Sequence, residues 1–265
     1  MMHIDQLGRE LKIKDTPRRI ISLVPSQTEL VVALGLLDSL VGITKFCVHP
    51  ERIIETKEIV GGTKKIHFEK IKSLKPDIIL CNKEENTKEI VEQLQNEFPV
   101  HVSDVSSLSE SVELIQLYGK LFDKKEEAST MVSKIETERL VFDRFIAPLP
   151  KRRVAYFIWR KPYMVSGSKT FIDNMLTING FVNVFADEVR YPEISVETLK
   201  TIEDLDVIML SSEPYPFSPK HVKEFQNICP NTKIILVDGE YFSWYGSRML
   251  EAFTYFTKLR EYIEQ

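Results

Sequence analysis

RIISLVPSQTELVVALGLLDSLVGIT, residues 19–44, contains a complete strand–helix–strand pattern. The apolar run before Pro25 and the run LVGIT at the end of the stretch both predict short buried strands. Between them, Ser26 with Glu29 three residues later is typical of a capping box at a helix start, and Gly35 is typical of a helix end. Two strands joined through a helix run parallel in one sheet, so this stretch predicts an α/β fold.

The same alternation continues to the C-terminus with one interruption. Predicted strands lie at 77–81, 100–103, 153–159, 206–212 and 233–238, and predicted helices at 68–75, 87–98, 170–180, 195–202, 218–225 and 247–263. The interruption runs from Asp123 to Ile146 without glycine or proline, and its apolar stripe predicts one helix of about 35 Å. The predicted fold class is therefore α/β, with two Rossmann-like lobes that have central parallel sheets and are joined by one long backbone helix.

This pattern divides the chain into three parts. We expect an N-terminal α/β lobe at 1–122, a connecting backbone helix at 123–147 and a C-terminal α/β lobe at 148–265. Because the connecting helix offers no flexible residue as a hinge, the lobes are expected to rotate only slightly when a ligand binds.

Composition and charge exclude some classes of partner. The formal net charge is −4 and no basic stripe could neutralise phosphates, so nucleic acid is not expected as a partner. No apolar run approaches the roughly 20 residues that span a bilayer. Neither a secretory signal nor an N-terminal lipoprotein cysteine is visible in the sequence. The three cysteines (Cys47, Cys81 and Cys229) are odd in number and widely spaced, which is no disulfide framework.

Aromatic side chains gather where the predicted strands end. In open α/β sheets, ligands bind beyond the carboxyl ends of the strands. The residues at those ends are Pro25, Phe46 and Asn82 in the first half, and 159–163 (WRKPY), 212–215 (SEPY) and 238–246 (DGEYFSWYG) in the second. Such rings predict a site for a large, flat, partly apolar ligand in a cleft between the lobes. The alternative is that the rings pack a core or the interface between the lobes.

The stretch 238–246 is expected to be a loop that forms one wall of this site. Tyr241 and Trp244 are the predicted ligand contacts, with Glu240 as a polar anchor for an amide or amine at the edge of the ligand. Phe242 and Tyr245 can instead turn inward and seal the end of the sheet.

Several of these segments resemble one family. Residues 19–44, FEKIKSLKPDIIL (68–80), PYMVSG (162–167), YPEISVETL (191–199) and YFSWYGSR (241–248) resemble class III periplasmic binding proteins, the cobalamin-, siderophore- and haem-binding receptors of ABC importers. The resemblance covers nearly the whole chain in order and is nearest to the cobalamin receptors. It implies a two-lobed binding protein, not an enzyme, that has no intrinsic cofactor and holds a corrinoid (cobalamin-like) ligand. The alternatives are a protein for an Fe(III)–siderophore or haem, or a cytoplasmic corrinoid-binding protein without a transporter.

The resemblance also implies which residues touch the ligand. The positions that match are Pro25, Phe46, Tyr191, Glu240 and Tyr241, with Tyr163 or Met164 as one more. Two positions depart from the family's pattern, because Thr63 stands where the cobalamin receptors have a tryptophan and Trp244 where they have an arginine. These departures leave the identity of the ligand open.

Two glutamates are predicted to dock the protein onto a transporter. Glu69 and Glu197 each lie in the first turn of a predicted helix, one in each half, where the helix dipole alone favours a carboxylate. Both match positions at which the family presents one glutamate per lobe to arginines of an ABC permease dimer. The resemblance therefore implies a monomer that works with a permease in the periplasm or another extracytoplasmic space, with the cytoplasm as the alternative.

Motifs for catalysis or for a bare metal ion are weak. The sequence lacks GxSxG, HExxH and GxGxxG, and VSGSKT resembles the end of a P-loop but has Pro162 where the first glycine belongs. Of five histidines, His101 lies in a predicted strand and His221 on an amphipathic helix, so only His49 and His67 can face the cleft. Two histidines are too few for a dedicated zinc site. His49 remains a weak candidate for an axial ligand to haem iron or to the cobalt of a corrinoid.

Overall fold

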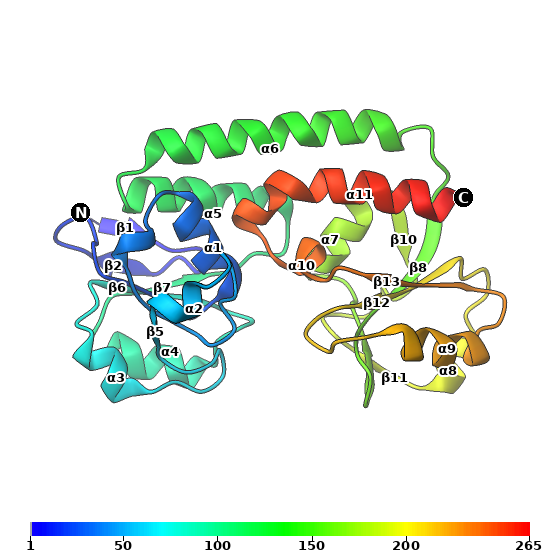
Figure 1. The fold of residues 1–265 in the computed structure, drawn as a ribbon, viewed down its shortest axis with the longest axis horizontal. Helices are drawn as coiled ribbons and strands as arrows, with labels where there is room; N and C mark the ends of the chain where they lie inside the picture. Colours follow the sequence, from blue (N-terminus) through cyan, green and yellow to red (C-terminus); the bar gives the residue numbers. More distant parts are fainter. Residues whose placement is uncertain (1) are drawn as a thin grey trace. The chain divides into compact units, whose positions relative to one another are not determined.

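The computed structural model describes residues 2–265 and divides them into two compact units (Figure 1). The first unit holds the chain up to Val105, together with Ser109–Glu136 and Trp244–Leu250. The second unit holds Ser106–Leu108, Thr137–Ser243 and Glu251–Gln265. These units cut the chain at other places than the expected domain limits (1–122, 123–147 and 148–265), and those limits stay a prediction.

The first unit is built on a parallel sheet. In spatial order its strands are β5 (Glu58–Ile59), β4 (Leu40–Ile43), β3 (Ile20–Ser22), β6 (Ile78–Asn82) and β7 (Val100–Ser103). Every residue of β3, β6 and β7 is buried, as expected for strands covered by helices on both faces. A small antiparallel hairpin, β1 (Met2–Ile4) and β2 (Glu10–Lys12), precedes the sheet.

Helices cover both faces of this sheet. On one face α3 (Phe68–Ser73) and α4 (Lys88–Gln95) bury Ile71 and Leu94 against Ile79 and Cys81 of β6. On the other face lie α1 (Pro25–Ala33) and α5 (Leu108–Leu121), as Figure 1 shows. Two short elements, η1 (Leu37–Ser39) and α2 (Ile53–Thr56), precede and follow β4 in the chain. The sequence pattern predicted α1, α3 and α4 but not α5.

The second unit has a mixed sheet. Its strands run in the order β11 (Glu193–Ile194), β9 (Tyr163–Val165), β8 (Arg152–Trp159), β12 (Val207–Ser211) and β13 (Lys233–Val237), and β10 (Phe181–Asn183) also pairs with β8. The strands β8, β12 and β13 are parallel, whereas β9 pairs antiparallel with both of its neighbours, β8 and the edge strand β11. The reason lies at 160–162, because a connection this short between β8 and β9 closes only an antiparallel pair.

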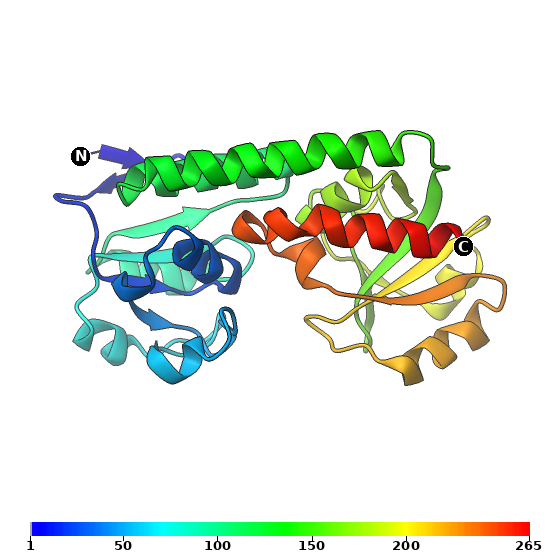
Figure 2. The same cartoon turned by 45° about the horizontal axis from the view of Figure 1, so that its top comes forward.

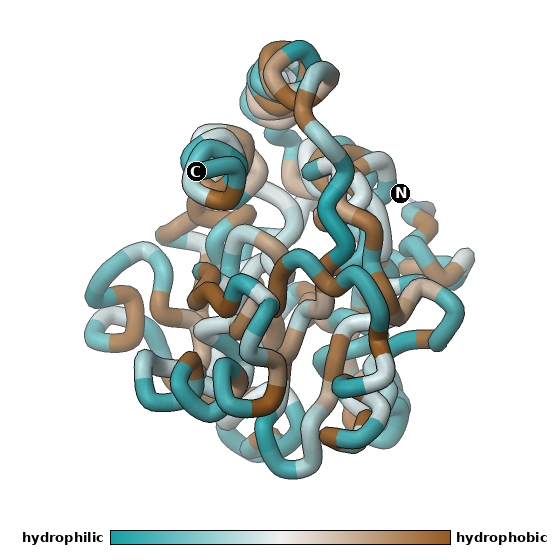
Figure 3. The backbone as a smooth tube through the Cα atoms, turned by 90° about the vertical axis from the view of Figure 1, so that its right-hand side faces the viewer, coloured by the Kyte–Doolittle hydropathy of each residue, from teal (hydrophilic) through white to brown (hydrophobic). Residues whose placement is uncertain are grey.

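The helices of the second unit bury aromatic side chains. On one face α8 (Val196–Lys200) and α9 (Pro219–Ile228) pack onto the sheet, with Phe225 against Phe157 at 4.7 Å between ring centroids. The remaining helices of this unit are α7 (Phe171–Ile178), α10 (Glu240–Ser243) and α11 (Met249–Glu264). Helix α11 buries Phe253 and Phe256 and exposes Glu261, and Figure 3 shows hydrophilic and hydrophobic turns on the helix that ends at the C label.

One long helix runs from the first unit into the second. Helix α6 (Lys125–Ile146) spans 22 residues without a break, as Figure 2 shows. Its residues up to Glu136 belong to the first unit, and those from Thr137 belong to the second. The predicted fold class is confirmed: two α/β units with central parallel strands, joined by a long helix. In the described part of the chain, no helix combines the length and the apolarity needed to cross a membrane.

Some predicted helix ends are correct and others are wrong. Ser218 and Pro219 begin α9 as predicted, and Gly35 and Gly180 adopt the positive φ angles of 78° and 71° that end a helix. The capping box at Ser26 is wrong, because α1 begins one residue earlier, at Pro25, and Ser26 is buried. Proline has a fixed φ and no N–H to satisfy, so it starts the helix itself. The prediction that 238–246 is a loop is wrong in part, because the stretch contains helix α10, and its last residue, Gly246, begins the 3-10 turn η2 (Gly246–Arg248).

Candidate ligand-binding site

The exposed apolar ring at the carboxyl end of the first sheet is Phe46. Its side chain is 49% exposed, and the ammonium of Lys45 lies 5.0 Å from its ring centroid. A Cβ on Gly62 would lie only 3.1 Å from the ring, so any larger residue there would displace the ring by a few tenths of an ångström. Directly after Phe46, the buried Cys47 thiol lies 3.1 Å from the hydroxyl of Thr28 and anchors the loop onto α1. Phe46 is thus an exposed ring on a fixed backbone.

Pro25 lies at the same edge of the first sheet. It is the half-buried first residue of α1, directly after the N-cap Val24 and three residues beyond the end of β3 at Ser22. The hydroxyls of Ser22 and Thr28 both donate to the Val24 carbonyl at 3.0 Å, which fixes this strand-to-helix junction. Pro25 and Phe46 therefore follow neighbouring parallel strands, β3 and β4.

Trp244 also belongs to the first unit and is buried. It is 7% exposed, its ring meets the edge of the His49 ring at 5.4 Å, and the guanidinium of Arg248 lies 5.2 Å from its centroid. Arg248 in turn forms an ion pair of 2.7 Å with Glu29 on α1. The structure thus brings together two predicted site residues, Trp244 and His49. The role of each toward a ligand stays a prediction.

The next residue, Tyr245, turns inward, as the alternative for this stretch predicted. Its hydroxyl accepts a hydrogen bond of 3.0 Å from the Gln27 side chain and lies 3.3 Å from the Ser103 hydroxyl. The Tyr118 hydroxyl donates to the other end of the Gln27 amide at 2.6 Å. Burial raises the pKa of Tyr245 to about 12, so the hydroxyl stays protonated and available as a donor. This network holds the C-terminal segment onto the first sheet.

Glu240 and Tyr241 belong to the second unit. Glu240 is the half-buried first residue of α10, and its N–H donates to the Asp238 carboxylate at 3.1 Å. The Tyr241 ring stacks on Tyr255 of α11 at 4.5 Å with an interplanar angle of 15°. Because the compact units separate Trp244 from these two residues, the expectation that the three form one wall stays a prediction.

The other predicted contacts of the second unit lie on or beside its edge strands. The half-buried Tyr163 on β9 donates to the Glu224 carboxylate at 2.5 Å, and Arg160 forms an ion pair of 2.8 Å with the same carboxylate. Burial, followed by the Glu224 contact, raises the pKa of Tyr163 to about 12. Met164 is half-buried on the same strand, and Tyr191 is half-buried just before β11. Tyr163 is therefore a fixed ring with a fixed hydroxyl.

Two further aromatic residues stand at the strand ends of the second unit. Trp159, the last residue of β8, is 39% exposed and meets Tyr215 edge to face at 5.6 Å. The indole N–H donates to the Lys161 carbonyl at 3.1 Å, and the Tyr215 hydroxyl contacts His221 at 3.2 Å. Both rings belong to the strand-end segments (159–163 and 212–215) that were predicted to line a ligand site, and this role stays a prediction.

Both predicted docking glutamates are exposed. Glu69 lies in the first turn of α3 and Glu197 in the first turn of α8. Ser195 caps α8 by accepting the Thr198 N–H at 3.0 Å, as the sequence predicted. Their role toward a permease stays a prediction.

In the part of the chain that the structure describes, the histidines do not cluster with other metal-ligating side chains. Among residues 2–265, no group of three or more His, Cys, Asp and Glu side chains could hold a metal ion. His101 is 2% exposed on β7, as predicted, and neither ring nitrogen has a hydrogen-bond partner in the described part of the chain. Burial lowers the pKa of His101 to about 4, although Asp5 nearby opposes this shift. His101 is therefore neutral at pH 7.

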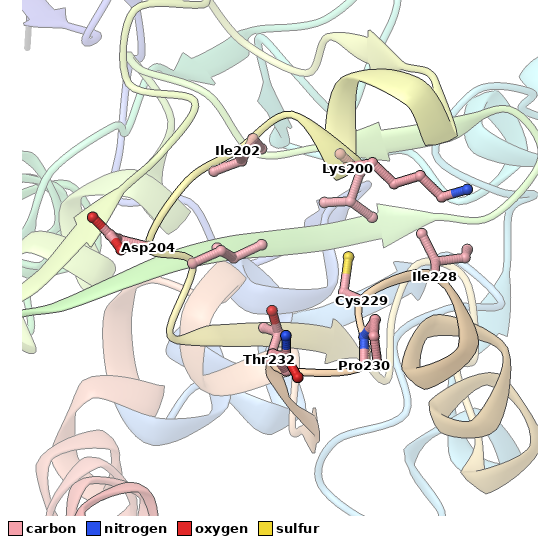
Figure 4. Close-up of a pocket in the computed structure, with 10 residues that line it drawn as sticks. Lys200, Ile202, Asp204, Ile228, Cys229, Pro230 and Thr232 are labelled. Atoms are coloured by element: carbon pink, nitrogen blue, oxygen red, sulfur yellow. The ribbon is translucent and has the colours of Figure 1, made fainter.

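A separate cavity of about 420 Å³ opens in the second unit (Figure 4). It lies at the amino ends of β12 and β13, between the last turns of α8 and α9, and Figure 4 shows the Cys229 thiol beside Ile228 and Pro230. Parallel α/β sheets bind ligands at the opposite, carboxyl end. None of the ligand contacts expected from the sequence lines this cavity.

The arrangement defines a class of protein. Each unit presents aromatic and charged side chains at the carboxyl ends of its strands, and a long helix joins the two units. These are the features of a two-lobed α/β solute-binding protein, in which the fold supplies a fixed frame and the strand ends supply the contacts.

Comparisons with known proteins identify the family within this class. The model of the periplasmic binding protein family matches residues 20–227, so the chain belongs to this family. It is 27% identical over 241 residues to the vitamin B12-binding protein of Pectobacterium carotovorum subsp. carotovorum (strain PC1), covering 89% of this chain and 86% of that protein. It is 26% identical over 203 residues, 74% of this chain, to the uncharacterized ABC transporter substrate-binding lipoprotein YvrC of Bacillus subtilis (strain 168). That match spans 64% of the length of the lipoprotein, just under two thirds.

A solved structure is similar in fold. The crystal structure of the periplasmic vitamin B12-binding protein BtuF of Vibrio cholerae superposes with a TM-score of 0.80 at 24% identity, covering 94% of this chain and 99% of that one. At this identity the similarity establishes the fold alone. As a member of a family of binding proteins, the chain is not an enzyme and takes up a ligand instead of carrying a resident cofactor.

Proposed function

We propose that this chain is the substrate-binding protein of an ABC importer and that its ligand is a corrinoid. The observation that carries the proposal is the half-exposed Phe46 ring at the carboxyl end of β4, held in place by Gly62 and Cys47. In the second unit, Trp159 and Tyr215 offer a second aromatic surface at strand ends. Fixed rings cover a large, flat, partly apolar ligand at little entropic cost. The similarity to a vitamin B12-binding protein along 89% of the chain supports a corrinoid in particular.

Calorimetric titration with cyanocobalamin, haemin and a panel of ferric siderophores tests this proposal. Cyanocobalamin is expected to bind, and Phe46→Ala is expected to weaken it about 10- to 100-fold, as for a stacked ring in a binding site. The matched control is Leu37→Ala, a 38% exposed apolar residue at the amino end of β4, which should leave the affinity unchanged. Tighter binding of haemin or of a siderophore than of cyanocobalamin would contradict the corrinoid assignment. The absence of heat from every probe would contradict the proposed binding function.

We propose that the chain works as a monomer in an extracytoplasmic space and contacts an ABC permease dimer through Glu69 and Glu197. Exposed acids at helix starts steer a basic partner and set its orientation. Charge reversal by Glu69→Arg or Glu197→Arg should reduce stimulation of the importer's ATP hydrolysis in liposomes and leave ligand affinity unchanged. Glu113→Arg, an exposed acid on α5, is the control. Equal stimulation by all four proteins, or recovery of the chain in the cytoplasm without a transporter, would contradict this part of the proposal.

A further inference from the structure

The loop that follows β6 in the first unit is rigidly built. The side-chain oxygen of Asn82 accepts the backbone N–H groups of Glu84 at 2.8 Å and Glu85 at 3.2 Å. The side chain of Asn86 accepts the Asn82 N–H at 2.9 Å and donates to the Thr63 carbonyl at 2.9 Å. Asparagine side chains that replace backbone partners in this way fix the turn. The backbone position of Glu85 is therefore determined by the fold.

The carboxylate of Glu85 lies in a place that does not favour a charge. Its side chain is half-buried, and within residues 2–265 the structure describes no hydrogen bond to its carboxylate. The nearby cation of Lys64 instead donates to the backbone carbonyl of Glu84 at 2.5 Å. Burial raises the pKa of Glu85, and the Lys64 charge offsets this only in part. A partly desolvated carboxylate without a protein donor destabilises the fold, and strained groups of this kind are common at binding sites.

Glu85 stands at the same edge of the sheet as Phe46. It follows β6, Phe46 follows β4, and β3 lies between these strands. The turn at Gly62 and Thr63 links the two loops, because Phe46 packs on Gly62 while Asn86 binds the Thr63 carbonyl. The half-buried carboxylate of Glu85 and the exposed Phe46 ring thus belong to one surface at the carboxyl end of the first sheet.

We propose that Glu85 is a specificity-determining ligand contact, whose carboxylate accepts a hydrogen bond from an N–H group at the rim of the ligand and repels a ligand that presents carboxylates there. The proposal rests on the function proposed above and names the chemistry of the ligand's edge: carboxamide or amine donors. A donor from the ligand supplies the hydrogen bond that the fold leaves unmade. A ligand carboxylate at the same place would bring two negative charges together, so repulsion would discriminate against ligands with carboxylates there.

The test compares two probes on the full chain. Cyanocobalamin carries carboxamides at its rim, whereas haemin carries two propionates. We expect Glu85→Gln to shift the ratio of the two affinities at least 10-fold toward haemin. Glu84→Gln removes the same charge from the neighbouring residue and should leave the ratio within twofold. A ratio unchanged by Glu85→Gln, or shifted equally by Glu84→Gln, overturns the proposal.

The failure of the proposed function gives a different result. If the wild type binds neither probe, the corrinoid function is contradicted, and the Glu85 proposal then survives only if Glu85→Gln gains haemin binding.

A second measurement uses the free protein. Because the fold disfavours the ionised carboxyl, Glu85→Gln should unfold at a higher temperature than the wild type at pH 8, and the difference should shrink as the pH falls through 4, where the acid takes up its proton in both states. A lower unfolding temperature at pH 8 would reveal a structural partner for the carboxylate and overturn the proposal.

Discussion

The two tryptophans of this chain lie in different environments, and replacing each by alanine should separate them. Trp244 is 7% exposed and packed between His49 and Arg248, whereas Trp159 is 39% exposed at a strand end. With about 200 Å² for a tryptophan side chain and about 25 cal/mol/Å², the additional burial of Trp244 is worth about 1.5 kcal/mol. Trp244→Ala also leaves an enclosed cavity of about 100 Å³, which costs about 2 kcal/mol more, while the space left by Trp159→Ala opens to solvent.

We therefore expect Trp244→Ala to lower the free energy of unfolding by about 4 kcal/mol and Trp159→Ala by about 1 kcal/mol. Urea denaturation followed by circular dichroism measures both values, and a difference of about 3 kcal/mol corresponds to about 10 °C in Tm for a chain of this size. Since the sequence contains two tryptophans, Trp159→Phe and Trp244→Phe each leave one, and the emission of Trp244 should lie at the shorter wavelength. Equal losses of stability, or a larger loss for Trp159→Ala, would refute the reasoning.

Three further predictions concern pH, a buried cation and a thiol. His101 is neutral in the fold with a pKa of about 4 but takes up a proton below about pH 6.5 when unfolded, so the wild type should lose up to about 3 kcal/mol between these pH values. Urea denaturation at pH 7 and pH 4.5 should show a smaller loss for His101→Phe, and identical pH dependence would count against this account. Arg260 is 1% exposed and donates to two backbone carbonyls at 2.8 Å. Arg260→Met should therefore lower the free energy of unfolding, measured by thermal unfolding, by about 3 kcal/mol. A loss below about 0.5 kcal/mol would mean that the carbonyls find other partners. A maleimide should label one thiol per native molecule, Cys229, and three thiols in urea. The reason is that Cys47 and Cys81 are 0% exposed and that burial raises the pKa of both. Rapid labelling of a second thiol in the native protein would contradict this prediction.

The strand–helix alternation could be predicted because its signals are local. Apolar runs of four to eight residues, the cap at Ser218 with Pro219, and the glycines at 35 and 180 all act within a few residues of chain. The start of α1 was misplaced because two local signals compete there, and Pro25 prevails over Ser26. The antiparallel edge at β9 was not predicted, since it depends on pairing between strands and not on the pattern of either strand.

The candidate site was only partly predictable from the sequence. The rule that ligands bind at the carboxyl ends of parallel strands identified Phe46 and Pro25, and the structure places both at the edge of the first sheet. Glu85 was missed because an acid in a KEEN stretch has the pattern of an exposed loop. The hydrogen bond from Asn86 to the Thr63 carbonyl, which ties this loop to a segment more than 20 residues away, appears only in the folded chain.

By itself, the sequence determined the α/β class, the order of most helices and strands, and the family. Only the tertiary structure decided where the aromatic stretch near the C-terminus belongs. The hydrogen bond from Gln27 to Tyr245 joins residues 218 positions apart, and it places Trp244 and Tyr245 in the first unit while Tyr241 belongs to the second. Hydrophobic periodicity records which side of a strand or helix is buried, but it carries no information about the partner that buries it. That partner is fixed by packing and hydrogen bonds between distant segments, so the division of the stretch between the two units appears only in the folded chain.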